Sequence, residues 1–220
     1  MKRLLKPAVF LLCLTPLALV ALDLWQGRIR GEWVKEITHR TGWWGLFLIT
    51  ATLAVTPLRR LSGWNAVQSY RRMLGLFGFS YIAIHFLIYV VLDRQIPFDP
   101  LAWREVGKDI AKRPYITVGF TGFTLLLPLA LTSTRGWIRR LGKRWTALHS
   151  LVYVVALAGV VHFMWSVKAD IAVPTRFAAV IVVLLAVRLV PKHVFQRRQV
   201  PRTKPAVQAN PPLAEAAPPG

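Results

Sequence analysis

The stretch YRRMLGLFGFSYIAIHFLIYVVLD (Tyr70–Asp93) decides the fold class. No Lys, Arg, Asp or Glu separates Arg72 from Asp93, and one histidine, His85, lies within this apolar run. A helix needs about 20 mainly apolar residues to cross the roughly 30 Å hydrocarbon core of a bilayer. We therefore predict a membrane-spanning helix here. An ionisable side chain inside such a helix is costly and usually functional.

Five further apolar runs are long enough to be spans, so the expected fold is an all-α polytopic membrane bundle of about six transmembrane helices. The six predicted spans are Pro7–Leu24, Thr41–Leu58, Leu74–Leu92, Tyr115–Thr132, Thr146–Val167 and Ile171–Val190. The nine tryptophans lie at or near the ends of these runs, where an amphipathic indole ring prefers to sit. The sequence shows no internal repeat that helps to assign the fold.

The distribution of charge predicts the orientation of the spans. Eighteen of the 29 Lys and Arg residues flank one side of the predicted bundle, with a single acid, Glu215. The loops on the other side hold the remaining eight of the nine acids. The positive-inside rule then places both termini in the cytoplasm of a bacterial cell, with the spans in its inner membrane. An even number of spans agrees with this orientation.

Composition excludes several classes of protein. The chain has 220 residues, 55% of them hydrophobic, and a formal net charge of +20. Its basic residues lie between apolar runs rather than on a compact basic face, which argues against a nucleic-acid partner. The single cysteine, Cys13, excludes an internal disulfide and is read as a small lipid-facing or packing residue.

The predicted organisation has three parts. Residues 1–40 form the first transmembrane helix and an outer loop, residues 41–190 form the transmembrane core, and residues 191–220 form a basic, Pro/Ala-rich, disordered cytoplasmic tail. A signal peptide is the alternative for the first span, but no small-x-small cleavage site follows it, so we favour a retained helix.

The five histidines differ in their predicted surroundings. His39 and His193 lie outside the apolar runs and are read as solvated or headgroup-facing. His85 and His162 lie in two spans that both run from inside to outside, and both fall toward the outer face. They can therefore face one another at one level, as two axial ligands of a haem iron must. A hydrogen bond to a neighbouring helix is the plain alternative for a single membrane histidine.

A second, inner site is less complete. His149 lies about 20 Å before His162, and Arg71 lies about 21 Å before His85, at 1.5 Å per helical residue. A spacing of thirteen residues leaves the side chains of His149 and His162 roughly 140° apart on an ideal helix. A bend near Gly159, or haems approached from different sides, would have to absorb that angle. Arginine is a poor iron ligand because it stays protonated, and pairing with a propionate or lipid phosphate is an equal alternative for Arg71.

The haem expected at these sites is of the b type, one or two per chain. Covalent attachment of a c-type haem needs a C-x-x-C-H motif, which the sequence lacks. No G-x-G-x-x-G follows a predicted strand either, so we do not expect these residues to take hydride from a nicotinamide by themselves. Electrons must then come from another molecule and leave to another, since no loop carries a centre for substrate reduction.

The chain resembles the MsrQ (YedZ) family of haem-binding membrane subunits. Four segments carry this resemblance: TGWWGL (Thr41–Leu46), TPLRR (Thr56–Arg60), Tyr70–Asp93 and Arg144–Trp165. The histidine spacing also resembles the wider ferric-reductase-like transmembrane superfamily. In that superfamily two helices each supply two haem ligands. His149 and His162 match one pair and His85 matches the outer member of the other, whereas Arg71 stands where the inner histidine is usual.

The resemblance implies cofactors and partners that the residues alone do not give. It implies FMN near the cytoplasmic side, with no binding residues assignable. It implies a periplasmic molybdopterin-containing methionine-sulfoxide reductase, MsrP, as the electron acceptor. The donor is a cytoplasmic flavin reductase or membrane quinol. Two rivals remain at this point: a ferric- or quinone-linked reductase with another acceptor, and a non-redox transporter whose histidines line a path. The mixed-charge loop Asp93–Arg113 is a candidate docking surface.

Overall fold

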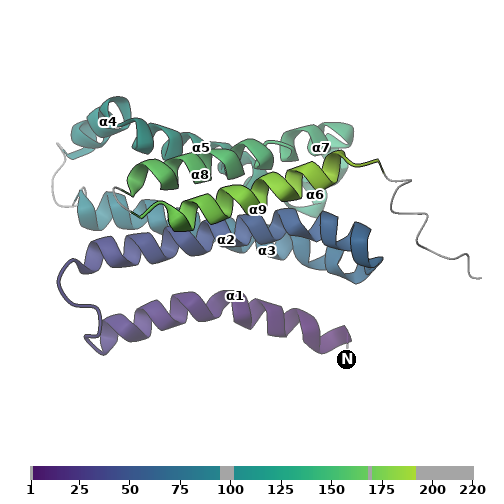
Figure 1. Cartoon of the computed structure of the whole chain (residues 1–220), viewed down its shortest axis with the longest axis horizontal. Coiled ribbons are helices and arrows are strands. Elements are labelled where there is room, and N and C mark those ends of the chain that lie inside the picture. Colours follow the sequence, from purple (N-terminus) through teal and green to yellow (C-terminus); the bar gives the residue numbers. More distant parts are fainter. Residues whose placement is uncertain (1, 95–101, 168–169, 192–220) are drawn as a thin grey trace, which may run out of the picture. The chain divides into compact units, whose positions relative to one another are not determined.

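A computed structural model describes residues 2–94, 102–167 and 170–191, and these residues are helical apart from short connections (Figure 1). The elements are α1 (Lys2–Trp25), α2 (Trp33–Ser62), η1 (Asn65–Tyr70), α3 (Arg71–Ile88), η2 (Tyr89–Asp93), α4 (Ala102–Lys112), α5 (Pro114–Leu131), α6 (Arg135–Leu141), α7 (Lys143–His149), α8 (Val152–Ser166) and α9 (Ala172–Leu189).

Within the described residues, six helical stretches are long and apolar enough to cross a membrane, which confirms the predicted all-α polytopic membrane protein. They are Leu5–Trp25, Trp33–Ser62, Asn65–Asp93, Pro114–Leu131, Lys143–Ser166 and Ala172–Leu189. Large apolar side chains point outward from them, among them Leu12, Leu131 and Val183. Such side chains suit a lipid environment.

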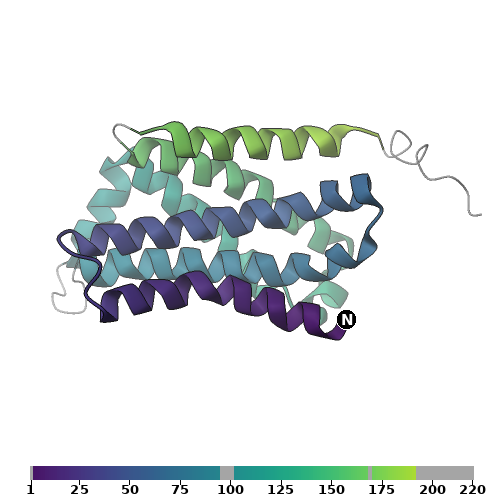
Figure 2. The ribbon, with the colours of Figure 1, turned by 60° about the horizontal axis from the view of Figure 1, so that its bottom comes forward.

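The helices pack in pairs around one apolar core. Helix α2 packs along α3, and α5 packs along α8, with α9 lying against α2 and α8. Figure 2 shows that α1 lies on one side of the α2–α3 pair and that α9 lies on the other side. The core contains Leu53 of α2, Leu126 of α5, Ala156 of α8 and Ile181 of α9, all nearly or fully buried. The two pairs are joined by further contacts, of α3 with α5 and of α2 with α8.

Helix α2 starts earlier than the sequence predicts. It runs for 30 residues from Trp33, whereas the predicted span begins at Thr41. The first two turns are polar on their exposed side and are supported by ion pairs, Lys35 with Glu32 and Arg40 with Glu36. Hydropathy alone cannot detect such turns, because their charged residues lower the mean hydropathy of the stretch. His39 thus lies on a helix, and the expectation that it lies in a loop is wrong.

The chain between His149 and His162 is broken once, at Ser150 and Leu151. There the N–H groups bond three residues back, from Leu151 to Leu148 and from Tyr153 to Ser150, which is the tighter 3₁₀ pattern. Helix α8 then continues through Gly159 to Ser166. The departure from regular α-helical hydrogen bonding therefore falls eight and nine residues before Gly159.

Helix α1 is joined to the bundle by a hydroxyl group. Tyr81 of α3 is buried, donates its O–H to the Cys13 carbonyl at 2.8 Å and accepts the Leu17 N–H at 3.0 Å. In a regular helix that N–H would bond that carbonyl directly. The hydroxyl is inserted into the hydrogen-bond ladder next to Pro16, where side chains and prolines commonly bend helices. Cys13 is buried against Tyr81 and Leu48, consistent with a packing residue.

Replacing Tyr81 with Phe is expected to lower stability by about 1 kcal/mol, because two bridging hydrogen bonds are lost while the ring is kept. For a chain of this size that corresponds to a fall in Tm of roughly 2–4 °C, measurable by thermal unfolding in detergent. Tyr70→Phe is the matched control, since the Tyr70 hydroxyl makes no hydrogen bond to any residue the structure describes. Equal Tm values for the two variants would show that the bridge contributes nothing.

Contacts divide the chain into two units, Met1–Val190 and Pro191–Gly220. Nearly all of the second unit, including His193 and the predicted tail, lies outside the described residues. The predicted boundary between residues 40 and 41 falls inside the continuous helix α2.

Candidate functional site

Two of the predicted ligands meet at one end of the bundle. His85 near the end of α3 and His162 near the end of α8 are both partly buried, and their ring centres lie 6.1 Å apart with the ring planes at 84°. The sequence predicts this meeting from depth alone. The same end holds the connection between α1 and α2 and helix α4 (Figure 1), so it is the end predicted to face outward.

Each of these rings is held by a backbone carbonyl of a neighbouring helix. His85 Nδ1 lies 2.8 Å from the Thr38 carbonyl oxygen of α2. His162 Nδ1 lies 2.7 Å from the Tyr115 carbonyl oxygen of α5. A carbonyl can only accept, so each neutral ring carries its proton on Nδ1 and leaves the Nε2 lone pair available. Neither Nε2 atom makes a hydrogen bond within the described part of the chain.

This donor set fits a haem iron better than a bare metal ion. Within the described residues, no group of three or more His, Cys, Asp or Glu side chains could hold a metal. Two imidazoles suffice when a porphyrin supplies the other four ligands. Metal–imidazole bonds are about 2.0–2.1 Å long, and ring centres 6.1 Å apart leave room for one ion between two rings. A carbonyl bonded to the far nitrogen is also the usual partner of a ligating histidine.

His149 has a different environment. Its Nδ1 and Nε2 atoms each lie 3.2 Å from a carbonyl oxygen, of Trp145 and Leu129 respectively, and its ring stacks on Trp145 at 3.9 Å. A neutral imidazole has one N–H and can donate to only one of these carbonyls. The structure therefore does not bring His149 to the pair formed by His85 and His162, and neither ring nitrogen of His149 faces away from the protein backbone.

Arg71, the predicted counterpart of His149, is the first residue of α3 and is partly buried. Between Arg71 and His149 the structure shows no hydrogen bond, which leaves the inner site less defined than the outer one.

Comparison with known proteins places the chain in a family. The family described as "Ferric reductase like transmembrane component" matches residues 41–160. The "Protein-methionine-sulfoxide reductase heme-binding subunit MsrQ" of Rhodospirillum rubrum is 48% identical over 190 residues, 86% of this chain and 89% of the relative. The subunit of the same name from Xanthomonas euvesicatoria pv. vesicatoria is 42% identical over 206 residues, 91% and 92% of the two chains.

The chain belongs to the MsrQ family. No solved structure matches it. The ferric-reductase-like match ends two residues before His162 and leaves out α1 and α9, whereas the MsrQ relatives extend over most of the chain. The predicted resemblance to the family is confirmed.

The sequence does not indicate where the side chain of Arg188 lies. Its flanking position suggests a topogenic charge, but it lies between helices, where Nη2 donates to the Leu53 carbonyl at 2.6 Å and Nη1 donates to the Tyr153 hydroxyl. The Leu53 carbonyl is free because Pro57, four residues later, has no N–H to offer it. The pairing of Pro57 with a partly buried arginine 131 residues later has no sequence signature.

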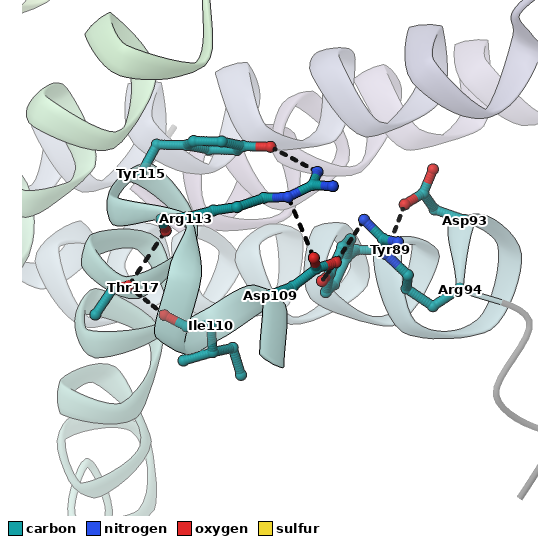
Figure 3. A network of polar contacts seen from close by, with 8 residues as sticks. All are labelled: Tyr89, Asp93, Arg94, Asp109, Ile110, Arg113, Tyr115 and Thr117. Atoms are coloured by element: carbon teal, nitrogen blue, oxygen red, sulfur yellow. Dashed lines mark hydrogen bonds and ion pairs between the residues drawn. The ribbon is translucent and has the colours of Figure 1, made fainter. Parts of the chain in front are cut away.

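A polar network fixes the outer ends of α3, α4 and α5 (Figure 3). Asp109 of α4 accepts bonds from Arg94 at 2.5 Å, Arg113 at 3.2 Å and the Tyr89 hydroxyl at 3.2 Å. Arg113 also donates to the Tyr115 hydroxyl at 3.4 Å. The loop predicted as a docking surface is thus, in its described part, tied to the residue whose carbonyl holds His162.

His39 lies closer to the paired histidines than its position in the sequence suggests. Its ring packs edge-on against Phe163, with centres 5.3 Å apart, and Phe163 directly follows His162. On its other side, His39 lines an open polar cavity of about 690 Å³ between α2 and the end of α1. The cavity is lined by Asp23, Arg28, Ile29, Arg30, Glu32, Lys35, Glu36, His39 and Arg40.

Proposed function

We propose that the chain holds b-type haem through His85 and His162 and carries electrons across the bacterial inner membrane. Bound there, haem supplies a reversible one-electron carrier. The observation that supports this most strongly is the pair of rings 6.1 Å apart, each with its Nδ1 proton on a carbonyl and its Nε2 free. The printed name of the relatives, a heme-binding subunit, agrees with it.

The chain's own residues have three tasks in this proposal. His85 and His162 supply the two axial ligands. The Thr38 and Tyr115 carbonyls keep the proton on Nδ1 of each ring and hold its orientation. The apolar side chains of the surrounding core, among them Leu46 and Val160, keep water from the space between the helices.

The proposed donor acts at the inner end of the bundle and the acceptor at the outer end. The donor is a cytoplasmic flavin reductase or membrane quinol, with FMN as an additional cofactor. The acceptor is a periplasmic molybdopterin-containing methionine-sulfoxide reductase, MsrP, which repairs oxidised proteins. The basic stretch from Arg135 to Arg144 lies at the inner end, and the cavity next to His39 opens at the outer end. His149 and Arg71 are the proposed residues for a second haem or its propionates.

The test is electron transfer with purified components. Protein reduced with dithionite, freed of excess reductant and mixed with MsrP and methionine sulfoxide should be reoxidised at the haem absorbance. Without MsrP, or without sulfoxide after one turnover of MsrP, it should stay reduced. Reoxidation by ferric chelates and not by MsrP would favour the ferric-reductase rival. A colourless wild type after expression with ample haem would overturn the proposal and leave a transporter.

His149→Ala should leave the outer haem intact, because about 13 residues of helix, roughly 20 Å, separate it from His162. Its reduced-minus-oxidised spectrum should keep the outer component, while reduction by the inner-side donor slows. If the inner histidine holds a second haem, the haem content per chain falls by half. A complete loss of haem on this substitution would contradict the assignment of His85 and His162 as one shared site.

A further inference from the structure

A glycine lies against the ring of each paired histidine. A Cβ atom on Gly42 would come within 2.9 Å of His85 Nδ1 and 3.1 Å of its Cε1. A Cβ atom on Gly119 would come within 2.6 Å of His162 Nδ1 and 2.8 Å of its Cε1. Contacts shorter than 3.0 Å are too close for real side chains, so any residue other than glycine would displace the ring.

The two arrangements have the same spacing along the chain. The carbonyl that binds each ring belongs to the residue four positions before the glycine, Thr38 before Gly42 and Tyr115 before Gly119. Each histidine follows its carbonyl residue by 47 positions. One set lies on α2 and α3 and the other on α5 and α8, so the chain contains this local geometry twice, although the surrounding sequence shows no repeat.

Helix geometry explains why the glycine stands at that position. Inside a helix the carbonyl of residue i already accepts the N–H of residue i+4. A second donor has to approach that oxygen from beside the helix, and the Cβ of residue i+4 is tilted back toward the helix N-terminus, over this approach. Only a residue without Cβ at i+4 leaves room for an imidazole ring to reach the second lone pair of the oxygen.

We infer that Gly42 and Gly119 are positioning residues for the haem ligands: each lets its histidine donate Nδ1–H to a helix carbonyl and present Nε2 to the iron. The inference rests on the proposed function, because it assigns these glycines a role only if His85 and His162 bind haem. It goes beyond that proposal by naming residues that touch neither iron nor porphyrin but set the orientation and basicity of both ligands.

The test compares substitutions one helical turn apart. Gly119→Ala should weaken haem retention in detergent by roughly 10- to 100-fold, the usual effect of losing the partner of a ligating histidine. The haem that remains should have a higher midpoint potential, since an imidazole without the Nδ1–H bond is less basic and stabilises ferric iron less. Gly122→Ala is the matched control on the same helix, since its Cβ would meet only the Ala158 Cβ at 3.6 Å.

A second pair separates ligand positioning from packing. Gly42→Ala presses on His85, whereas Gly45→Ala on the same helix would place its Cβ 2.6 Å from Ile82 Cγ1 and touch no histidine. Both should lower the Tm, but only Gly42→Ala should change the reduced-minus-oxidised spectrum and the midpoint potential. Equal spectra and potentials for Gly42→Ala and Gly45→Ala would overturn the inference and leave the two glycines as packing residues.

A cavity variant covers the case in which Gly119→Ala does not accumulate. In His162→Gly, free imidazole can enter the vacated space and bind haem without being fixed to α8. Adding Gly119→Ala to this variant should then lower haem retention only slightly, because the exogenous ring can move away from the new methyl group. If the cost of Gly119→Ala is as large in this background as in wild type, the inference is wrong. Haem loss in His85→Ala and His162→Ala, with normal haem in the glycine variants, would refute the inference but retain the proposed function.

Discussion

Substituting alanine for either His85 or His162 is expected to remove the outer haem, with at least a tenfold loss of the absorbance that belongs to this haem. The two rings lie 6.1 Å apart and belong to different helices, so each substitution removes one of the two proposed axial ligands and leaves the other in place. Loss of one axial ligand also leaves the remaining imidazole with an iron that is open on one side. The reduced-minus-oxidised visible spectrum of purified protein measures the effect.

His39→Ala is the control for this experiment. The ring of His39 packs against Phe163, next to His162, and lines the polar cavity. Among the described residues, no hydrogen bond or ring contact joins His39 to His85 or His162. It should retain haem with an unchanged spectrum. If His85→Ala and His162→Ala retain different haems, so that their spectra lose different components, the two histidines do not share one iron.

Asp109→Ala is expected to loosen the outer end of the bundle by about 2 kcal/mol, roughly a 30-fold change in local opening. The side chain of Asp109 is 14% exposed. Its carboxylate pairs with Arg94 and Arg113 and accepts a hydrogen bond from the Tyr89 hydroxyl. Its removal leaves two guanidinium groups without their shared acceptor, and breaking a buried pair costs more than an exposed one. The expected loss of stability stays at about 2 kcal/mol because Arg113 is 48% exposed and keeps water as a hydrogen-bond partner.

Hydrogen exchange of the α4 amides, Ala102–Lys112, reports this opening. Glu105→Ala is the control on the same helix. Glu105 is 59% exposed and pairs only with Lys108, which holds the pKa of its carboxyl below the usual range. Exposed pairs contribute little, so exchange in this variant should differ from wild type by less than about fivefold. Similar exchange rates in the Asp109 and Glu105 variants would show that the network of Figure 3 does not stabilise α4.

The sequence predicts the fold class and the outer pair of histidines because both depend on periodicity and depth. Apolar runs determine which segments cross the membrane, and the direction of each span sets the level of His85 and His162. The start of α2 at Trp33 is not predictable in this way, since its first turns are polar and stabilised by ion pairs. Hydropathy responds to apolar content and not to helix formation in water.

The features that sequence reasoning misses are contacts of the backbone. The Thr38 and Tyr115 carbonyls bind the paired rings, and every residue has such a carbonyl. The position of Arg188 depends on a carbonyl that Pro57 leaves free. The one available signal is a glycine four residues after each carbonyl, and it becomes visible only when the partner helix is known. The ring of His149 likewise lies between two backbone carbonyls, those of Trp145 and Leu129.

The length of α2 bears on how a soluble partner reaches the chain. Thirty residues of helix extend for about 45 Å, whereas the hydrocarbon core of a bilayer is about 30 Å thick. Unless the helix tilts strongly, its first turns stand among the lipid headgroups or in water, and they carry Lys35, Glu36 and Arg40. A water-soluble protein can then touch α2 without entering lipid, so it requires no membrane-binding surface of its own. Such a protruding helix permits a soluble protein to bind one membrane subunit transiently and repeatedly.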